Sequence, residues 1–309
     1  MSAAFDTIDP GILFNRLQAY CGVTGKALDW FRSYLSGRRQ YVSIRNANSD
    51  ELDLQYGVPQ GSILGPLLFT IYTIPLAHIL QKEGISYHMY ADDNQDYIGF
   101  KPIQRVADMT IERVNAVLCT VENWLQENKL KVNGEKTEYM LIGMKGQLKK
   151  ITAPNLVVSG HIIKPSTSIR NLGAYQDETL SMKVHVANVT KSANFQLHNL
   201  CKIRKCLDEE TTKIVVHQLI TSRLDYTNSL LCNVPDTTIK PLQKVQNSAA
   251  RLVTGARKFD HISPVLKTLH WLPVKYRVMF KVLLMTYKAL NGLAPEYLSD
   301  MLTLYSPVR

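Results

Sequence analysis

The periodicity of the hydrophobic residues changes near residue 178 and divides this chain of 309 residues into two parts. Before this position, alternating hydrophobic and polar runs, which are typical of strands, stand between runs with helical spacing. After it the strand pattern disappears, and helical stripes such as Leu242, Val245 and Ala249 continue to the end. The sequence therefore predicts an α+β part over residues 1–178 and an all-helical part over residues 179–309.

Local signals give the expected order of elements in the first part. Asp9 and Pro10 are typical of the cap and first position of a helix, and Thr24 is a candidate cap for a second helix. Alternation over residues 40–56 predicts two paired strands with a turn at residues 46–50. Further helices are expected at residues 65–80 and 111–125.

Two adjacent aspartates, Asp92 and Asp93, stand between β-rich runs at residues 87–91 and 95–100. This order predicts a hairpin with both carboxylates at its turn. Carboxylates so close together repel each other and favour a bound cation, and their oxygens suit Mg²⁺. Aspartate is also a common turn residue, so the pair alone leaves a purely structural role open.

The charge balance and the apolar stretches limit the class of partner. Lys and Arg number 36 against 26 Asp and Glu, a formal net charge of +10. A surface of this charge attracts polyanions, either nucleic acid or an anionic membrane, although it also occurs in merely basic proteins. The first residues lack the features of a signal peptide, and the longest apolar stretch, residues 67–80, is too short to span a membrane. We expect an intracellular protein of the nucleus or cytoplasm, with no membrane partner.

The five cysteines are widely scattered and form no CxxC pair. This spacing indicates neither a disulfide framework nor a zinc site. Reduced and mostly buried thiols are therefore expected.

Several ordered segments together resemble the reverse transcriptases of animal LINE-type (non-LTR) retrotransposons. SAAFD (2–6), GVPQGSILGP (57–66) and YADD (90–93) are similar to three palm motifs, WLQENKLKVNGEK (124–136) to the next, and RNLG (170–173) to the primer-grip strand. SRLDY (222–226), QNSAARL (246–252) and LHWLPV (269–274) resemble the thumb and the region after it. The resemblance covers essentially the whole chain, and so many motifs in order are far more specific than one short match.

This resemblance implies a fold and a reaction. The fold is a polymerase palm, with a small antiparallel sheet and packed helices, followed by a helical thumb-like region. The reaction is RNA-directed DNA synthesis, in which dNTPs extend a DNA primer on an RNA template with two Mg²⁺ ions. Asp92 matches the metal-binding catalytic carboxylate and Asp93 its less critical neighbour. No obligate protein partner is implied.

Four further residues match positions that contact nucleotide or template in the family. Phe5 matches the aromatic gate under the incoming sugar, and Lys136 matches a lysine near the pyrophosphate. Gln60 and Gly61 match residues at the incoming nucleotide and template. The residues themselves leave simpler readings open, because Phe5 also suits core packing and Lys136 suits a solvated surface.

The family places another indispensable metal-binding aspartate two residues before the segment that SAAFD resembles, at a position one residue before Met1. Asp6 is a poor substitute, since six residues of extended strand span roughly 20 Å. The fingers segment that precedes the palm in the family is also missing. We therefore expect a truncated copy with little or no polymerase activity. A non-catalytic nucleic-acid-binding remnant and a fragment without a role remain as alternatives.

Overall fold

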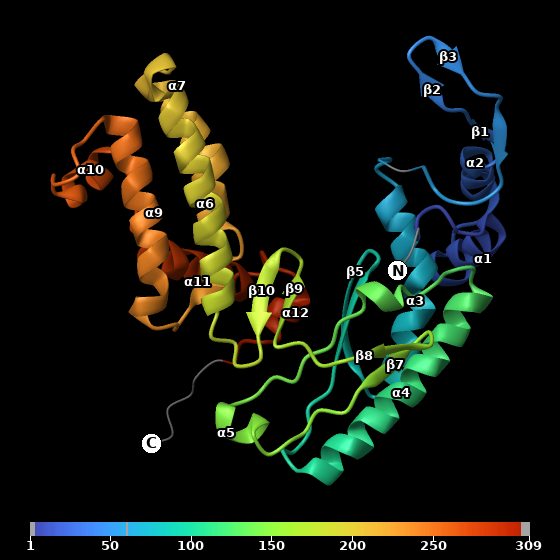
Figure 1. Ribbon diagram of the computed structural model, residues 1–309. Helices are drawn as coiled ribbons and strands as arrows, with labels where there is room; N and C mark the ends of the chain where they lie inside the picture. Colours follow the sequence, from blue (N-terminus) through green and yellow to red (C-terminus); the bar gives the residue numbers. More distant parts are fainter. Residues whose placement is uncertain (1–3, 60, 304–309) are drawn as a thin grey trace. The chain divides into compact units, whose positions relative to one another are not determined.

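The computed structural model describes residues 4–59 and 61–303. The chain forms two compact units, Met1–Ser166 and Thr167–Arg309 (Figure 1). The first mixes helices with short antiparallel strand pairs and the second is mainly helical, which confirms the α+β fold class. The boundary between the units precedes a hairpin at residues 168–177, whereas the boundary expected near residue 178 follows it.

Over its described residues, the first unit contains helices and four strand pairs. The helices are α1 (Pro10–Cys21), α2 (Gly25–Leu35), α3 (Gly65–Lys82), α4 (Gln104–Glu127), α5 (Lys145–Leu148) and the 3₁₀ turn η1 (Gly134–Lys136). The strands are β1 (Arg38–Gln40), β2 (Ser43–Ile44), β3 (Ala47–Asn48), β4 (Leu52–Leu54), β5 (Ser86–Tyr90), β6 (Asp93–Tyr97), β7 (Leu156–Val158) and β8 (His161–Ile163). They pair antiparallel as β1 with β4, β2 with β3, β5 with β6 and β7 with β8.

The start of α1 shows how the sequence fixes a helix boundary. The Asp9 carboxylate accepts hydrogen bonds from the backbone N–H groups of Gly11 at 2.8 Å and Ile12 at 3.2 Å. Pro10 takes the first helical position, where its missing N–H group costs no hydrogen bond. Gly22 ends the helix in the left-handed conformation, with φ of 64°. The expected capping of this helix is confirmed.

The core of the first unit is built around α3. Phe69 and Tyr72 of this helix are completely buried, and they share one hydrophobic core with Leu13 and Leu17 of α1. Leu125 near the end of α4 belongs to the same core. Figure 1 shows α3 and α4 as the two long helices of this unit. Burial of such side chains typically contributes about 1.5–3 kcal/mol each.

The ribbon of β1 to β4 turns earlier than the sequence suggested. Ser43 pairs with Asn48 and Ile44 with Ala47, so the turn consists of Arg45 and Asn46. Residues 47 and 48, which were expected in a turn, lie in β3. A two-residue turn needs residues in the left-handed region, and Arg45 has φ of 57°.

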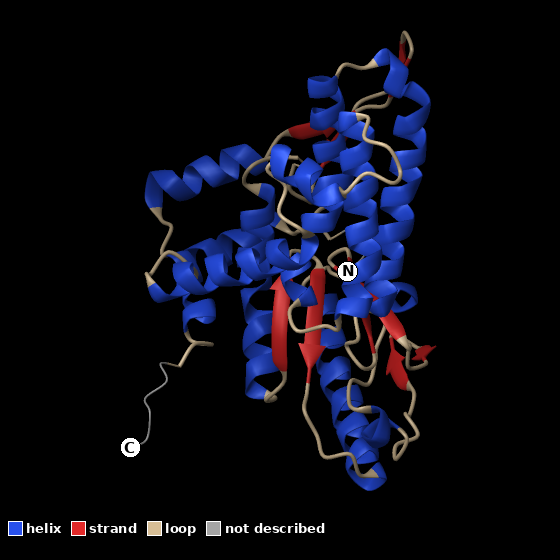
Figure 2. Ribbon diagram, turned by 90° about the vertical axis from the view of Figure 1, so that its left-hand side faces the viewer, coloured by secondary structure: helices blue, strands red, loops and turns tan. Residues whose placement is uncertain are grey.

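The second unit contains one strand pair among its described residues. It comprises β9 (Ser168–Asn171), β10 (Ala174–Asp177), α6 (Lys183–Ile203), η2 (Arg204–Cys206), α7 (Glu209–Val216), the π-helix η3 (His217–Thr221), α8 (Ser222–Asp225), η4 (Asn228–Leu231), α9 (Asp236–Thr254), α10 (Ile262–Thr268), α11 (Val274–Leu290) and α12 (Glu296–Ser299). β9 and β10 pair antiparallel, and the other elements of the unit are helices. Figure 2 shows that helices dominate the described chain.

The core of the second unit forms where α6 packs against α9. The stripe Leu242, Val245 and Ala249 of α9 is buried, as its spacing predicts. Ala193 of α6 is completely buried, and Trp271, which precedes α11, joins the same core.

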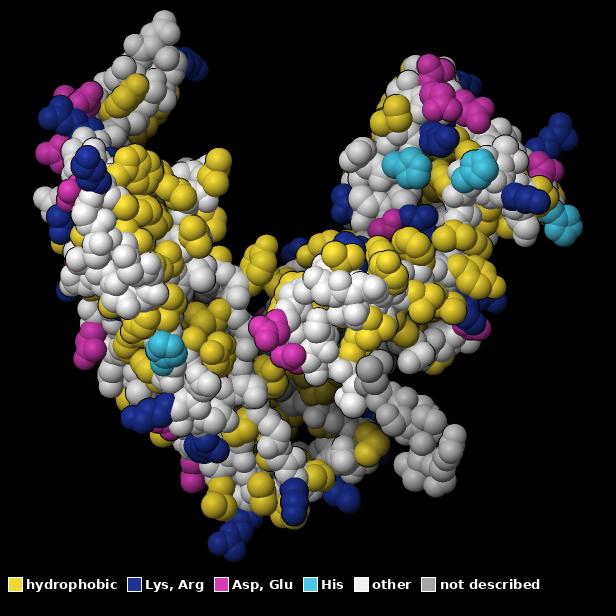
Figure 3. Space-filling view, turned by 180° about the vertical axis from the view of Figure 1, so that it is seen from behind, with side chains coloured by type: hydrophobic (Ala, Val, Ile, Leu, Met, Phe, Trp, Pro, Cys, Tyr) yellow, Lys and Arg dark blue, Asp and Glu magenta, His cyan; other side chains and the backbone are white. Residues whose placement is uncertain are grey.

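The surface departs from one expectation. All five cysteines are free and exposed, so the prediction of mostly buried thiols is wrong. They stand at helix ends or on outward helix faces, where a thiol adds nothing to either core. Many hydrophobic side chains are also exposed, as Figure 3 shows for one face. None of the described helices is both long and apolar enough to cross a membrane.

Candidate active site

The two acidic residues lie at the tip of the β5–β6 hairpin. Tyr90 pairs with Asp93, which leaves Ala91 and Asp92 as a two-residue turn. The predicted hairpin is confirmed, with the small correction that Asp93 begins β6 and only Asp92 belongs to the turn. Ala91 has φ of 51°, a left-handed conformation that alanine adopts at a cost.

The two faces of this hairpin have different partners. On one face, Tyr87 and Met89 pack against the core of the first unit. On the other, the rings of His88 and Tyr97 stack with centroids 5.4 Å apart, and Tyr97 Oη lies 3.3 Å from His88 Nε2. The turn is therefore carried on strands that the core fixes from one side.

The carboxylates at this tip are suited to a hard cation. Asp92 is half-buried and Asp93 is exposed. Among the described residues, no three His, Cys, Asp or Glu side chains gather into a group that could hold a metal ion. Mg²⁺ is commonly bound by only one or two carboxylates together with water and substrate phosphates, and these two residues fit that mode.

Phe5 lies against both the core and the loop that follows β4. Its half-buried ring is tilted by 33° to that of Phe69, with centroids 5.0 Å apart. Its carbonyl accepts a hydrogen bond from Val58 N at 2.9 Å, and the Ile8 carbonyl accepts one from Gly57 N at 2.7 Å. The structure thus joins the end of SAAFD to the start of GVPQG, although the bonded residues Phe5 and Val58 lie 53 positions apart in the sequence.

Gly57 permits this close approach of two backbones. A Cβ atom at this position would lie 2.9 Å from the Asp6 carbonyl oxygen and 3.0 Å from the Phe5 carbonyl oxygen. Its φ of 85° also favours glycine. No larger residue fits here without moving the loop away from Phe5.

Arg38 also binds the same loop, a role that the sequence did not predict. Its Nη2 donates to the carbonyls of Tyr56 at 3.0 Å and Gly57 at 2.7 Å, and its Nε donates to the Leu35 carbonyl at 3.1 Å. The signal in the sequence was weak, because one arginine in the pair Arg38 and Arg39 looks like any other surface cation.

The remaining predicted residues lie in separate places. Gln60 lies outside the described residues. Gly61 is exposed with φ of 78°, and no atom of the described residues beyond its chain neighbours lies within 4 Å of the position that a Cβ would take. Lys136 is exposed at the end of η1, where its backbone N–H group donates to Asn133 Oδ1 at 3.1 Å.

The 3₁₀ turn that carries Lys136 is placed by the β7–β8 hairpin. A Cβ atom at Gly134 would lie 2.6 Å from Cδ2 of His161. This close packing positions the backbone of η1, while the Lys136 side chain remains solvated. The structure therefore brings Phe5 to the Gly57 loop and fixes Asp92 on the same core, and it places Lys136 through a different contact.

A buried polar network supports these elements and was also missed. The hydroxyl of Tyr72 on α3 donates to the Asn128 carbonyl after α4, and Arg16 of α1 donates to Asn128 Oδ1. The Arg16 guanidinium lies over the rings of Tyr72, 4.5 Å from the centroid, and Trp124, 5.2 Å away. Trp124 and Asn128 belong to the segment that resembles a palm motif, but the contact with Arg16 depends on tertiary structure.

Comparison with known proteins identifies the family. The model of the reverse transcriptase (RNA-dependent DNA polymerase) family matches residues 1–176. In Drosophila melanogaster, the probable RNA-directed DNA polymerase from transposon X-element is 24% identical over 237 residues, which cover 74% of this chain and 25% of the relative. Two other proteins of Drosophila melanogaster are similar over 55% and 61% of this chain. They are the probable RNA-directed DNA polymerase from transposon BS, at 29% identity, and the RNA-directed DNA polymerase from mobile element jockey, at 24%.

The chain spans only 18–25% of the length of these three relatives. The family match nevertheless covers more than half of this chain, including both Phe5 and the Asp92 turn. The chain therefore belongs to the reverse transcriptase (RNA-dependent DNA polymerase) family.

Proposed function

We propose that this chain supplies part of an RNA-directed DNA polymerase site, with Asp92 as the catalytic metal ligand. The observation that carries the proposal is the placement of Asp92 at the tip of a hairpin packed on the same core as Phe5. Phe5 in turn is bonded to the loop that leads to Gly61. The SAAFD and GVPQG segments, which resemble nucleotide-binding segments of the family, thus pack on the same core as the acidic hairpin, and this supports the proposal.

Each residue has a proposed part in nucleotidyl transfer. Asp92, assisted by Asp93, would hold Mg²⁺, and two such ions would activate the attacking primer oxygen and stabilise the leaving pyrophosphate. The Phe5 ring would lie under the incoming sugar. Gly61 would let backbone approach the nucleotide and template closely, with Gln60 beside it. The Lys136 ammonium would attract the pyrophosphate.

The domain roles follow from the same proposal. Residues 1–178 would act as the palm, and residues 179–309 as a helical thumb-like region that grips the primer–template backbone. The net charge of +10 favours such binding. RNA template, DNA primer and dNTP would be the partners, in the nucleus or cytoplasm. The second candidate function, binding of the duplex without chemistry, draws on the same charge.

Primer extension separates the two functions. Purified protein would be incubated with an RNA template, a DNA primer, dNTPs and Mg²⁺, beside an Asp92→Ala variant and an Asp50→Ala control in the exposed ribbon. Extension that is lost only in Asp92→Ala supports the polymerase. Salt-dependent duplex binding without extension supports the binding function, and absence of binding contradicts both.

A further inference from the structure

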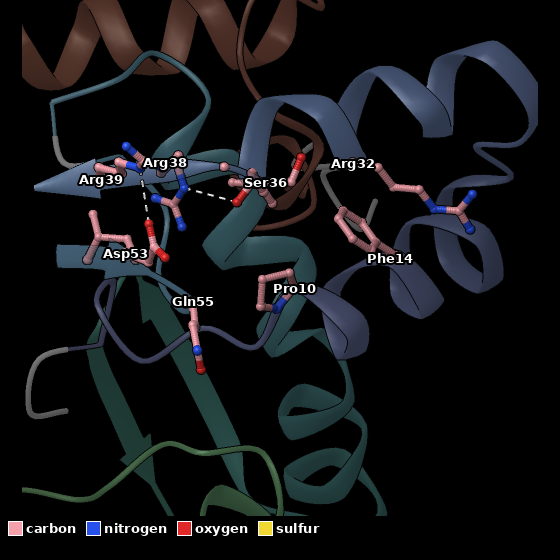
Figure 4. A pocket seen from close by; sticks show the side chains of 11 residues that line it. Pro10, Phe14, Arg32, Ser36, Arg38, Arg39, Asp53 and Gln55 are labelled. Carbon is pink, nitrogen blue, oxygen red and sulfur yellow. Dashed lines mark hydrogen bonds and ion pairs between the residues drawn. The ribbon is translucent and has the colours of Figure 1, made fainter. Parts of the chain in front are cut away.

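A pocket of about 590 Å³ opens on the first unit beside the loop that holds Phe5 (Figure 4). Its walls come from the start of α1, the end of α2, β1 and β4. Arg38 lines it and donates to the Tyr56 and Gly57 carbonyls, so one wall of the pocket is bonded to the loop. The volume lies within the range of about 300–1,000 Å³ that is usual for small-molecule sites.

The lining combines an apolar surface with cations. Pro10, Phe14 and Leu54 supply apolar surface, and Arg32 and Arg39 supply positive charge. Figure 4 shows Phe14 beside Arg32 on one side of the pocket, and Arg39 with Asp53 on the other. Three arginines against one aspartate give the lining a net positive charge. An anionic ligand with a flat apolar part matches this combination.

The arginines can reach such a ligand without breaking strong contacts. Arg32 Nη1 lies 3.2 Å from Asp29, and Arg39 lies 3.2 Å from both Glu51 and Asp53. All of these side chains are more than half exposed, and exposed ion pairs contribute about 0–1 kcal/mol. A guanidinium has five N–H donors, so each arginine can bind a phosphate beside its present partner. Arg38 differs, because backbone carbonyls engage both its Nε and Nη2.

We propose that this pocket binds one unpaired nucleotide of the template strand. Its base would stack on Phe14, with the Gln55 amide at the edge of the base, and the phosphates on its two sides would contact Arg32 and Arg39. Proteins read single-stranded nucleic acid in this way, with aromatic rings against bases and basic side chains on the backbone. The inference rests on the proposed function, since a polymerase template runs on from the duplex as a single strand. It adds a subsite outside the residues that match the family motifs.

The test compares a blunt RNA–DNA duplex with the same duplex carrying a single-stranded 5′ extension of the template, by fluorescence anisotropy at several salt concentrations. The extension should strengthen binding to the wild-type protein. Arg32→Ala should reduce this advantage by about tenfold, the loss expected for one charged hydrogen bond. It should also reduce the slope of log K against log [salt] for the extended duplex by about 0.7, as expected for one phosphate contact on a single strand. Arg45→Ala, at the exposed tip of the same ribbon, is the matched control. It should keep both the stronger binding of the extended duplex and the salt slope of the wild type.

Stacking has its own readout. 2-Aminopurine would be placed at successive positions of the extension, and one position should lose fluorescence on binding. Phe14→Leu keeps a hydrophobic side chain of similar size in the core contact, and it should abolish this quenching while the melting temperature stays close to that of the wild type. An RNA and a DNA extension of the template are compared to show which kind of nucleic acid the pocket accepts.

The outcomes distinguish this inference from the proposed function. If neither duplex binds, the proposed function fails. If both duplexes bind equally and Arg32→Ala changes nothing, only the pocket inference fails. Equal losses in Arg32→Ala and Arg45→Ala would mean general attraction of charge, which also overturns the pocket.

Discussion

The hydroxyl of Tyr72 donates a hydrogen bond to the backbone carbonyl of Asn128 at 2.8 Å, inside the core of the first unit. Tyr72 also accepts from the Asp9 N–H group at 3.4 Å, and its ring faces the Arg16 guanidinium. One side chain thus joins the start of α1, the middle of α3 and the end of α4. The Phe5 segment leads into α1, and the β5–β6 hairpin lies between α3 and α4 in the chain.

Tyr72→Phe should destabilise the first unit without creating a cavity. The substitution leaves the Asn128 carbonyl buried and removes its donor, which should lower the free energy of unfolding by about 1–3 kcal/mol. Urea denaturation of the two proteins measures this difference. Tyr41→Phe, at an exposed tyrosine of the ribbon, is the control, and an equal loss in both variants would show that the network has no special role.

Gly57 and Gly61 form a matched pair for testing the loop. Both have positive φ, 85° and 78°, but only a side chain at Gly57 would collide with Phe5 and Asp6. Gly57→Ala should therefore lower the stability both through backbone strain and through displacement of the loop. Gly61→Ala should lower it through backbone strain alone. Thermal unfolding should show the larger loss for Gly57→Ala. A loss that is the same in both would contradict the close approach described for Gly57.

The turn before Asp92 offers a substitution that should stabilise the protein. Ala91→Gly removes the strain of a left-handed alanine and should raise stability by up to about 1 kcal/mol, whereas Ala91→Val should lower it by about 1–2 kcal/mol. Ala116→Gly, on an exposed position of α4, should instead lower stability by about 1 kcal/mol. Differential scanning calorimetry shows whether each of the three variants is more or less stable than the wild type. A lower stability of Ala91→Gly would exclude strain at this turn.

The sequence predicted those features that depend on local chemistry. The cap at Asp9, the α9 stripe and the acidic hairpin follow from residues close together in the chain, and the structure confirms them. The sequence alone could not predict the contacts of Arg38 with the Gly57 loop or of Arg16 with Asn128, because the partners are distant in the chain. The turn at Arg45 was misplaced because a left-handed arginine leaves no compositional signal. The site roles of Asp92, Phe5, Gly61 and Lys136 remain predictions.

Acid should destabilise the second unit through His185. Burial holds the pKa of this histidine below its ordinary value of 6.5, and its Nδ1 accepts a hydrogen bond from Tyr175 N at 3.3 Å. Below pH 6.5 the unfolded chain therefore binds more protons than the folded one, and stability falls as the pH decreases towards the folded pKa. About one pH unit above 6.5 the imidazole is neutral in both states, and this residue contributes no further pH dependence.

Urea titrations of unfolding at pH 7.5, 6.5 and 5.5, chosen to bracket the ordinary pKa of histidine, test this assignment. His185→Gln should weaken the acid dependence but not remove it, since burial also lowers the pKa of His217 in the same unit. Asn194→Ala, at an exposed position of α6, removes no titratable group and should leave the dependence unchanged. An unchanged slope in His185→Gln would exclude His185 as its source.

The most direct test of the central claim, that Asp92 holds a catalytic cation, is to map the metal chemically. Fe²⁺ would replace Mg²⁺ in the complex with primer–template and dNTP, and ascorbate with peroxide would generate radicals that cut the polypeptide beside the bound ion. We predict cleavage within the YADD turn that excess Mg²⁺ suppresses, that Asp92→Asn abolishes and that Asp50→Asn leaves intact. Cleavage confined to other segments, or cleavage at this turn that survives Asp92→Asn, would contradict the assignment.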